Sequence, residues 1–322
     1  MSTDKSPEKA SASNTGAPPV ALIAGPTASG KSAAALALAE ALEKAGRRPV
    51  IVNADSMQVY SDIPILSAAP SEEEQDRVPH RLYGAWDGAD ACSAADWAKA
   101  ARAEIDAAHE DGAVPILVGG TGLYLKVLIE GIAPIPEIDP EVREVVRAMD
   151  RGIAHAALAI EDPLRAATLD PGDSQRIARA LEVKRSTGVT LADWQQAKSG
   201  GIGEEVDVHA AVLMPERQWI YERCDKRFAQ MVAGGAVEEV EALLARSLSP
   251  DLPVMRAIGV REIAALIAGD MTKDEAIAEG AQATRRYAKR QFTWLRNQSP
   301  PGWRRIETNS IDVEGVFDRL LR

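Results

Sequence analysis

The chain has 322 residues, of which 46% are hydrophobic and 26% charged, and its net charge at pH 7 is −11. This composition is typical of a soluble globular protein, and no apolar run is long enough to span a bilayer, so a membrane partner is excluded. The two cysteines, Cys92 and Cys224, and the four scattered histidines form no disulfide framework or metal-ligand pattern.

The N-terminal segment, residues 1–19, is rich in Ser, Ala, Pro and Lys and lacks the apolar core of a signal peptide. We expect a disordered tail here and a cytoplasmic protein.

A phosphate-binding loop follows the first apolar run at 20–24 and precedes the Ala- and Leu-rich run at 33–42, in the pattern G-x-x-x-x-G-K-[ST]. Glycines let the backbone approach phosphate oxygens, and the helix N-terminus adds its positive end. We expect Lys31 to contribute a charge to the phosphates and Ser32 a hydroxyl to bound Mg²⁺. The alternative is a plain tight turn. The expected phosphate-binding residues are Gly25, Pro26, Thr27, Ala28, Ser29, Gly30, Lys31 and Ser32.

Further apolar runs at 49–54, 114–119 and 209–214 alternate with helical patterns such as 32–45 and 94–109. This alternation predicts an α/β fold in which a P-loop NTPase-like parallel sheet is flanked by helices. From 139 to 199 the pattern is helical alone, with helix starts at Asp139, Asp162 and Asp173, and after 214 it is helical again. We therefore predict a core formed by 20–137 and 204–322, interrupted by an all-helical insertion domain at 138–203.

Asp55 directly follows the second predicted strand. Ligands of doubly wound sheets bind beyond the carboxyl ends of the strands, so Asp55 is expected to face the same crevice as the phosphate loop. A carboxylate there can hold Mg²⁺ through water or act as a general base. The alternative is a helix N-cap formed by Asp55 or Ser56, which uses similar positions.

The predicted strand at 114–119 ends in Gly119, Gly120, Thr121 and Gly122, where a phosphate-hydrolysing enzyme usually carries an acidic residue. The lack of an acid there predicts that the loop holds a phosphorylated substrate for another kind of transfer. The glycines permit close approach of a ligand or another chain, or serve the turn alone, and Thr121 lies at the active edge of the sheet.

Basic residues gather near the C-terminus of this acidic chain. Between 284 and 305 there are seven basic residues and no acidic one, interleaved with aromatic residues. This pattern allows a local cationic face for a nucleic acid. Three arginines follow the last predicted strand: Arg217, Arg223 and Arg227. One of them can clamp a departing diphosphate through two hydrogen bonds; the alternative is that each is an ordinary surface arginine. In the insertion, Gln175, Arg176 and Arg179 read as a solvated face.

Seven motifs, in order along the chain, resemble the tRNA dimethylallyltransferase (isopentenyltransferase) family, and the similarity runs from about 20 to 296. They lie at residues 25–32, 55–60, 79–80, 93–97, 117–124, 179–183 and 288–296. The resemblance implies transfer of a dimethylallyl group from dimethylallyl diphosphate to N6 of the adenine 3′ of the anticodon, in tRNAs that read codons beginning with U. It also implies that the phosphate loop holds diphosphate with Mg²⁺, and that the insertion and the basic C-terminal helix bind the anticodon stem-loop.

By this resemblance Asp55 is the general base for the adenine amine, while Thr27 and Arg217 position the diphosphate. Binding of a nucleotide such as ATP is a further expectation for this type of loop, and we expect a monomer. The positions similar to tRNA-contacting positions of the family are Asp55, Ser56, Met57, Gln58, Thr121, Arg143, Gln175, Arg176, Ile177, Ala178, Arg179, Arg256, Gly259, Arg261, Lys289 and Arg290.

The chain departs from the family pattern at two places: Ala69 stands where the family usually has a lysine, and Val260 where it often has an aromatic residue. Three other functions remain as alternatives. A small-molecule or nucleotide kinase shares the phosphate loop, an adenylate isopentenyltransferase shares the chemistry, and a non-catalytic P-loop protein could bind RNA.

Overall fold

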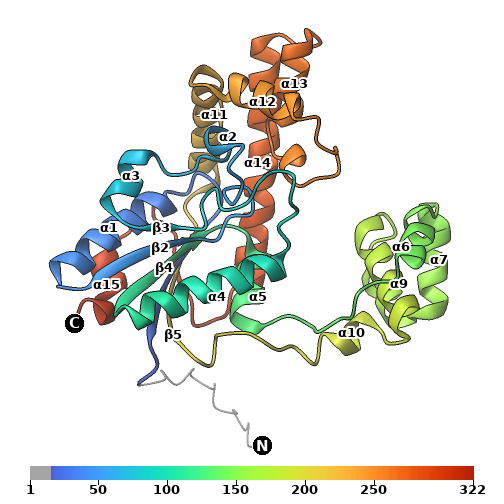
Figure 1. Ribbon diagram of the computed structural model, residues 1–322, viewed down its shortest axis with the longest axis horizontal. Coiled ribbons are helices and arrows are strands. Elements are labelled where there is room, and N and C mark those ends of the chain that lie inside the picture. Colours follow the sequence, from blue (N-terminus) through green and yellow to red (C-terminus); the bar gives the residue numbers. More distant parts are fainter. Residues whose placement is uncertain (1–15) are drawn as a thin grey trace, which may run out of the picture. The chain divides into compact units, whose positions relative to one another are not determined.

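A computed structural model describes residues 16–322 (Figure 1). The predicted disordered tail, 1–19, falls mostly outside the described residues. The chain divides into two compact units, one built from the segments up to Leu128 and from Ile202–Arg322, the other from Ile129–Gly201. The second unit is the helical insertion, which begins earlier than the predicted boundary at 138 and ends close to the predicted 203.

Within residues 16–322, six strands form one parallel sheet in the order β3-β2-β4-β1-β5-β6. The sheet places β1 at its centre, so the phosphate loop starts from a fully paired strand. The strands are β1 (Pro19–Ala24), β2 (Arg48–Asn53), β3 (His80–Arg81), β4 (Ala113–Gly119), β5 (Asp207–Leu213) and β6 (Arg304–Ile306).

The two edge strands were not predicted, and the expectation of helices alone after 214 was wrong at β6. Both strands are too short for an apolar pattern: β3 has two residues and β6 three. Arg304 and Arg305 of β6 are exposed and belong to the basic run of the sequence. Charged side chains are common on edge strands, where they discourage pairing with another chain.

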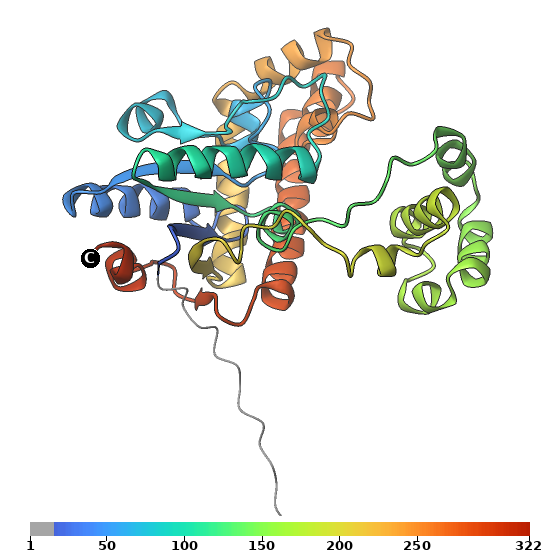
Figure 2. The ribbon, with the colours of Figure 1, turned by 60° about the horizontal axis from the view of Figure 1, so that its bottom comes forward.

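Helices cover both faces of the sheet (Figures 1 and 2). On one face, alternate strand residues such as Ile23, Ile116 and Leu213 pack with α1 and the C-terminal Phe317 in one core cluster. On the other face, α4 packs on β2 and β4. The helices of this unit are α1 (Lys31–Lys44), α2 (Pro64–Ser67), α3 (Glu72–Arg77), α4 (Ala94–Glu110), α5 (Gly122–Glu130), α11 (Arg217–Ala233), α12 (Ala236–Ala245), α13 (Val260–Ala268), α14 (Lys273–Gln298) and α15 (Val313–Val316), with 3₁₀ turns η1 (Val254–Arg256) and η2 (Asp318–Leu320).

Helices α11 and α14 pack against each other, and a glycine allows their close approach. A Cβ at Gly280 of α14 would lie 2.0 Å from Cζ of Phe228 on α11. Neither of these helices, nor any other helix among the described residues, has the length and apolar character that crossing a membrane requires.

The insertion has its own core, in which Leu158, Ile177 and Leu181 are fully buried. The predicted helix starts are confirmed: Asp139, Asp162 and Asp173 each accept a hydrogen bond from a backbone amide in the first turn. The sequence had not indicated the additional helices α7 and α10. The helices of the insertion are α6 (Pro140–Arg147), α7 (Arg151–Glu161), α8 (Pro163–Thr168), α9 (Ser174–Thr187) and α10 (Leu191–Trp194).

Candidate active site

The phosphate loop has the predicted strand-loop-helix geometry, between β1 and the start of α1 at Lys31. Ala28 and Gly30 have φ angles of 64° and 90°, which turn the backbone inward. The amide of Ser29 donates to the carbonyl of Pro26 (3.2 Å), closing the turn. A Cβ at Gly25 would lie 2.5 Å from Oγ of Ser29, so a larger residue there would displace this hydroxyl of the loop. These features form an anion cradle at a helix N-terminus.

Lys31 is buried within this cradle, and its Nζ has one long hydrogen bond, 3.4 Å, to the carbonyl of Pro26. Burial lowers its pKa from 10.5 to about 8; the nearby Asp55 opposes this shift and Arg227 adds to it. A charged ammonium is therefore costly here until an anion accompanies it. Ser32, the second residue of α1, is exposed beside a small recess lined by Glu74 and Tyr83.

Two arginines of α11 hold the phosphate loop. Arg223 donates through Nε to the carbonyl of Ala28 (2.9 Å), and Arg227 donates to the hydroxyl of Thr27. The guanidinium of Arg227 is buried beside the loop, and this burial lowers its pKa. This arrangement resembles the arginine clamp that the sequence suggested for a leaving diphosphate.

Arg217, expected from the resemblance to position the diphosphate, is not among these residues. It is the first residue of α11, and its guanidinium lies 4.8 Å from the ring centroid of Phe292. It lines a separate cavity of about 340 Å³ together with Arg296 and Arg305. Arg223 and Arg227, further along α11, contact the loop instead. The role of Arg217 in positioning the diphosphate stays a prediction.

Asp55 lies in a turn just after β2. Its amide donates to Oδ1 of Asn53 (2.8 Å), and its own Oδ1 accepts from the amide of Met57 (3.1 Å). No helix starts at Asp55 or Ser56, so the N-cap alternative is wrong. The turn is tied to the end of β4, because the amide of Ser56 donates to Oγ1 of Thr121 (3.0 Å).

Two aromatic side chains, Trp97 and Tyr124, pack at the end of β2, next to this turn. Nε1 of the fully buried Trp97 donates to the carbonyl of Asn53 (2.9 Å), and its ring stacks on Tyr124 at 4.4 Å between centroids. Burial raises the pKa of Tyr124, and the charge of Asp55 contributes to the rise. The motifs at 93–97 and 117–124 therefore hold the end of β2 in place.

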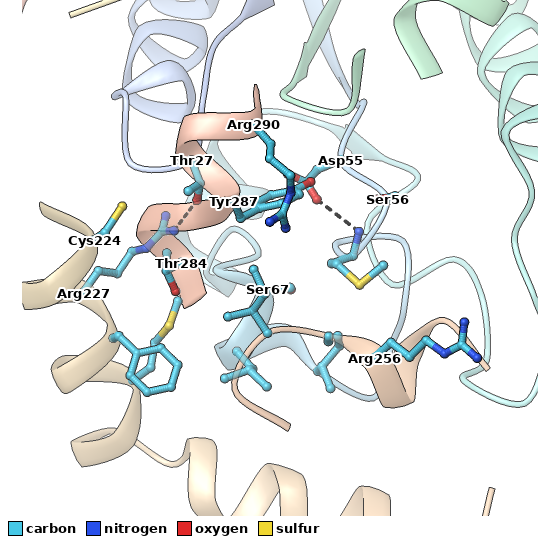
Figure 3. A pocket seen from close by; sticks show the side chains of 17 residues that line it. Thr27, Asp55, Ser56, Ser67, Cys224, Arg227, Arg256, Thr284, Tyr287 and Arg290 are labelled. Carbon is cyan, nitrogen blue, oxygen red and sulfur yellow. Dashed lines mark hydrogen bonds between the residues drawn. The ribbon is translucent and has the colours of Figure 1, made fainter. Parts of the chain in front are cut away.

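A cavity of about 210 Å³ is lined by Asp55 and by Thr27 of the phosphate loop (Figure 3). Asp55 and Thr27 reach it from different loops, and Tyr287 and Arg290 reach it from α14. Burial raises the pKa of Tyr287, and the charge of Asp55 adds to this rise. Hydrogen bonds with Thr121 and Ser56 oppose it. The cavity is polar near these groups and otherwise apolar, with walls formed by Met57, Ile63, Leu66, Phe228, Met231, Ala257 and Ile258.

The remaining sequence-predicted residues of this unit take different places. Arg256 lines the cavity and pairs with Asp251, whereas the largely exposed Arg261 pairs with Glu262 at 2.9 Å. Gly259, at φ 100°, has a structural role because a Cβ there would lie 2.6 Å from Leu66 and 2.9 Å from Phe228. Gln58 uses its amide to donate to the carbonyls of Ser67 (3.1 Å) and Ala68 (2.6 Å) at the end of α2, while Lys289 and Arg290 are exposed on α14.

The sequence-predicted residues of the insertion divide into surface and core. Arg143, Gln175 and Arg176 are exposed, and Arg179 lies 3.7 Å from the buried carboxylate of Glu182. Ile177 is fully buried in the core of the insertion, and Ala178 packs against that core. The side chain of Ile177 therefore belongs to the core of the insertion, and a tRNA contact at this position stays a prediction. A buried apolar residue in a basic helix can be recognised by its spacing to Leu181, one turn later.

No group of three or more His, Cys, Asp or Glu side chains among residues 16–322 is arranged to hold a metal ion. The exposed Ser32 hydroxyl and the half-buried Asp55 carboxylate are oxygen donors of the kind that Mg²⁺ accepts. Mg²⁺ commonly binds through few protein groups together with substrate phosphates. The residues therefore fit an ion carried mainly by a diphosphate, not a permanent metal centre.

Comparisons with known proteins agree on one family. The family model described as IPP transferase matches residues 58–298. The chain is 61% identical to the tRNA dimethylallyltransferase of Erythrobacter litoralis, over 95% of this chain and 96% of that protein. It is 65% identical to the tRNA dimethylallyltransferase of Novosphingobium aromaticivorans, over 85% and 98%.

Solved structures give the same result. A crystal structure of the full-length tRNA isopentenylpyrophosphate transferase from Bacillus halodurans is similar with a TM-score of 0.66 and 31% identity, over 94% of each chain. A eukaryotic dimethylallyltransferase, captured in crystallographic snapshots while acting on tRNA, is similar with a TM-score of 0.73 and 26% identity, over 86% of this chain and 70% of that one.

Proposed function

The chain belongs to the IPP transferase family, and from this premise we propose that it is a tRNA dimethylallyltransferase. The reaction moves a dimethylallyl group from dimethylallyl diphosphate to N6 of the adenine that follows the anticodon, in tRNAs reading codons that begin with U. One observation carries the proposal: Asp55, Thr27 of the phosphate loop and Arg227, which donates to Thr27, line the same cavity of about 210 Å³. A base and a leaving-group site thus lie together, without the acidic residue that ATP hydrolysis usually requires.

Asp55 acts on the acceptor. An exocyclic amine conjugated to a purine is a poor nucleophile, so its proton must be accepted as the new C–N bond forms. Oδ1 of Asp55 accepts the amide of Met57, and this bond fixes the direction of the carboxylate. The amine nitrogen attacks C1 of the allylic group, the C–O bond to diphosphate breaks, and the amine proton passes to Asp55.

The phosphate loop acts on the leaving group. The allylic carbon ionises readily, so most of the rate enhancement should come from stabilising the charge that develops on the departing diphosphate. We propose Lys31, Arg223 and Arg227, with the amides of the loop, as the protein groups that do this, since Lys31 is buried in the loop and both arginines bond to it. Mg²⁺, bound to the diphosphate and to the hydroxyl of Ser32, would supply further positive charge.

The acceptor adenine must leave the anticodon stack to reach Asp55. Tyr287 offers an aromatic surface at the cavity, and the exposed Lys289 and Arg290 on the same helix can contact phosphates of the RNA. In the insertion, Arg143, Gln175 and Arg176 offer exposed polar side chains for the anticodon stem.

We further propose that the enzyme works as a monomer in the cytoplasm. Light scattering tests the oligomeric state, and cell fractionation tests the compartment.

The first experiment is a transfer assay with Mg²⁺, radiolabelled dimethylallyl diphosphate and an anticodon stem-loop that carries adenine 3′ of the anticodon. AMP and ATP serve as acceptors in parallel reactions. We expect label in the RNA alone. Label in AMP or ATP would instead identify an adenylate isopentenyltransferase, and no transfer to any acceptor would contradict the proposal and favour a kinase.

A further inference from the structure

Gln291 of α14 is a buried amide, 5% exposed, with hydrogen bonds at both ends. Its Oε1 accepts from the backbone amide of Thr27 (2.8 Å), and its Nε2 donates to the carbonyl of Gly120 (3.0 Å). One side chain therefore bridges the phosphate loop after β1 and the glycine turn after β4. A buried amide is tolerated when its polar atoms are paired, as both of these are.

The glycines of the β4 turn allow α14 to come close enough for this bridge. A Cβ at Gly120 would lie 2.4 Å from Nε2 of Gln291, and a Cβ at Gly122 would lie 2.2 Å from the ring of Trp294. The helix is thus held against the turn at two points. The sequence left open whether these glycines serve a ligand, another chain or the turn alone; in the structure Gly120 and Gly122 make room for α14 of the same chain.

Thr27 is held from two sides. Gln291 accepts its backbone amide, and Arg227 donates to its hydroxyl. Thr27 lines the cavity next to Asp55, and α14 brings Tyr287 and Arg290 to the same cavity. Gln291 follows Tyr287 by one helical turn, so it links the wall that receives the acceptor to the loop that holds the leaving group.

We propose that Gln291 is a positioning residue for the transfer reaction, which fixes Thr27 and the phosphate loop relative to the acceptor wall of α14. The inference rests on the proposed function for its effect on rate, but not for its effect on the loop. Gln291 contacts neither substrate; it sets the distance between them. A misplacement of about 1 Å between reacting groups can lower a rate by about 100-fold.

The test replaces Gln291 with Met, which keeps the approximate size of the side chain and removes both hydrogen bonds. Single-turnover rates are measured per folded enzyme, together with RNA affinity and the affinity for inorganic diphosphate with Mg²⁺. We expect the rate to fall by about 10- to 100-fold, with RNA affinity within about threefold of the wild type. Hydrogen exchange of the peptide 25–31 should accelerate, because the amide of Thr27 loses its hydrogen bond to residue 291. Thr293→Ala, an exposed change on the same helix, is the matched control.

Gln291→Glu provides a second variant with its own signature. A carboxyl buried against the carbonyl of Gly120 has a raised pKa, and in its protonated form it can accept from Thr27 and donate to Gly120 as glutamine does. The rate of this variant relative to wild type should therefore rise as the pH falls, whereas the relative rate of Gln291→Met should not. Because rates are measured per folded enzyme, a role in stability alone would not produce this pH dependence.

The proposal is overturned if folded Gln291→Met has the wild-type transfer rate and the wild-type hydrogen exchange of the loop. It is also overturned if the rate of Gln291→Glu relative to wild type does not change with pH. If the wild-type enzyme transfers no dimethylallyl group, the proposed function fails. Loop exchange and diphosphate affinity still decide in that case whether Gln291 positions the loop.

Discussion

Lys31 gives a quantitative prediction, because its pKa is set by burial in the phosphate loop. The fall from 10.5 to about 8 corresponds to a penalty of roughly 3 kcal/mol for carrying the charge before an anion binds. A bound diphosphate supplies the opposite charge and should return the pKa to 10.5 or above. Binding therefore includes uptake of a proton wherever the free lysine is neutral and the bound lysine is charged.

The sign and size follow from these two pKa values. Well below pH 8 Lys31 is protonated in both states, so no proton is taken up. With the free pKa at about 8, uptake should reach about half a proton at pH 8 and about 0.9 at pH 9. The affinity for inorganic diphosphate should correspondingly weaken as the pH rises above 8, by up to tenfold for each pH unit.

Calorimetry in two buffers of different ionisation enthalpy measures this uptake directly. The ionisation of diphosphate itself is determined by titrating the free ligand and is subtracted. Lys31→Arg, whose side chain stays charged throughout this range, should show no uptake beyond the ligand correction. If wild type and Lys31→Arg take up the same number of protons at pH 9, or if the wild type takes up none, burial in the loop does not lower the pKa of Lys31.

Three further predictions concern the roles of single groups. Asp55→Asn should lower the transfer rate by about 10²- to 10⁴-fold while RNA affinity in a filter-binding assay stays near wild type; an equal loss of binding would remove Asp55 as the base. Arg227→Ala should lower the single-turnover rate by about 100-fold and Arg217→Ala by no more than a few-fold, and the reverse order would restore Arg217 as the diphosphate ligand. Lys289→Ala combined with Arg290→Ala should weaken RNA binding and reduce the slope of log affinity against log salt by about 2, and an unchanged slope would exclude this face of α14 from the RNA interface.

Local sequence patterns predicted the parts of the site that depend on local physics. The phosphate loop follows from its glycine spacing between a strand and a helix, and the place of Asp55 follows from its position after β2. The same reasoning predicted the three Asp caps of the insertion, because capping uses only neighbouring residues. The structure confirms the strand-loop-helix geometry and the three caps, whereas phosphate binding by the loop and the role of Asp55 as a base stay predictions.

Long-range packing decides the parts that sequence patterns did not predict. Which arginine of α11 reaches the loop depends on how the helix crosses it, and the approach of α11 to α14 depends on Gly280 and Phe228. Gln291 lies within a motif of the family resemblance, but its partners, Thr27 and Gly120, are far away in the chain. Short edge strands such as β6 exist only because a neighbouring strand is there to pair with.

The distribution of charge around the loop bears on the family lysine that this chain replaces with Ala69. Ala69 follows the short helix α2, and its amide donates to the carbonyl of Pro64 (2.9 Å), so its backbone serves to end that helix. The loop itself still has Lys31 inside it and Arg223 and Arg227 bound to its backbone and hydroxyl groups. A leaving diphosphate gains negative charge as the C–O bond breaks, and cations held in fixed positions beside it stabilise that gain. On the proposed function we therefore expect the main electrostatic contribution to catalysis to come from Lys31 and the two arginines of α11, so that the chain can lack the lysine at position 69.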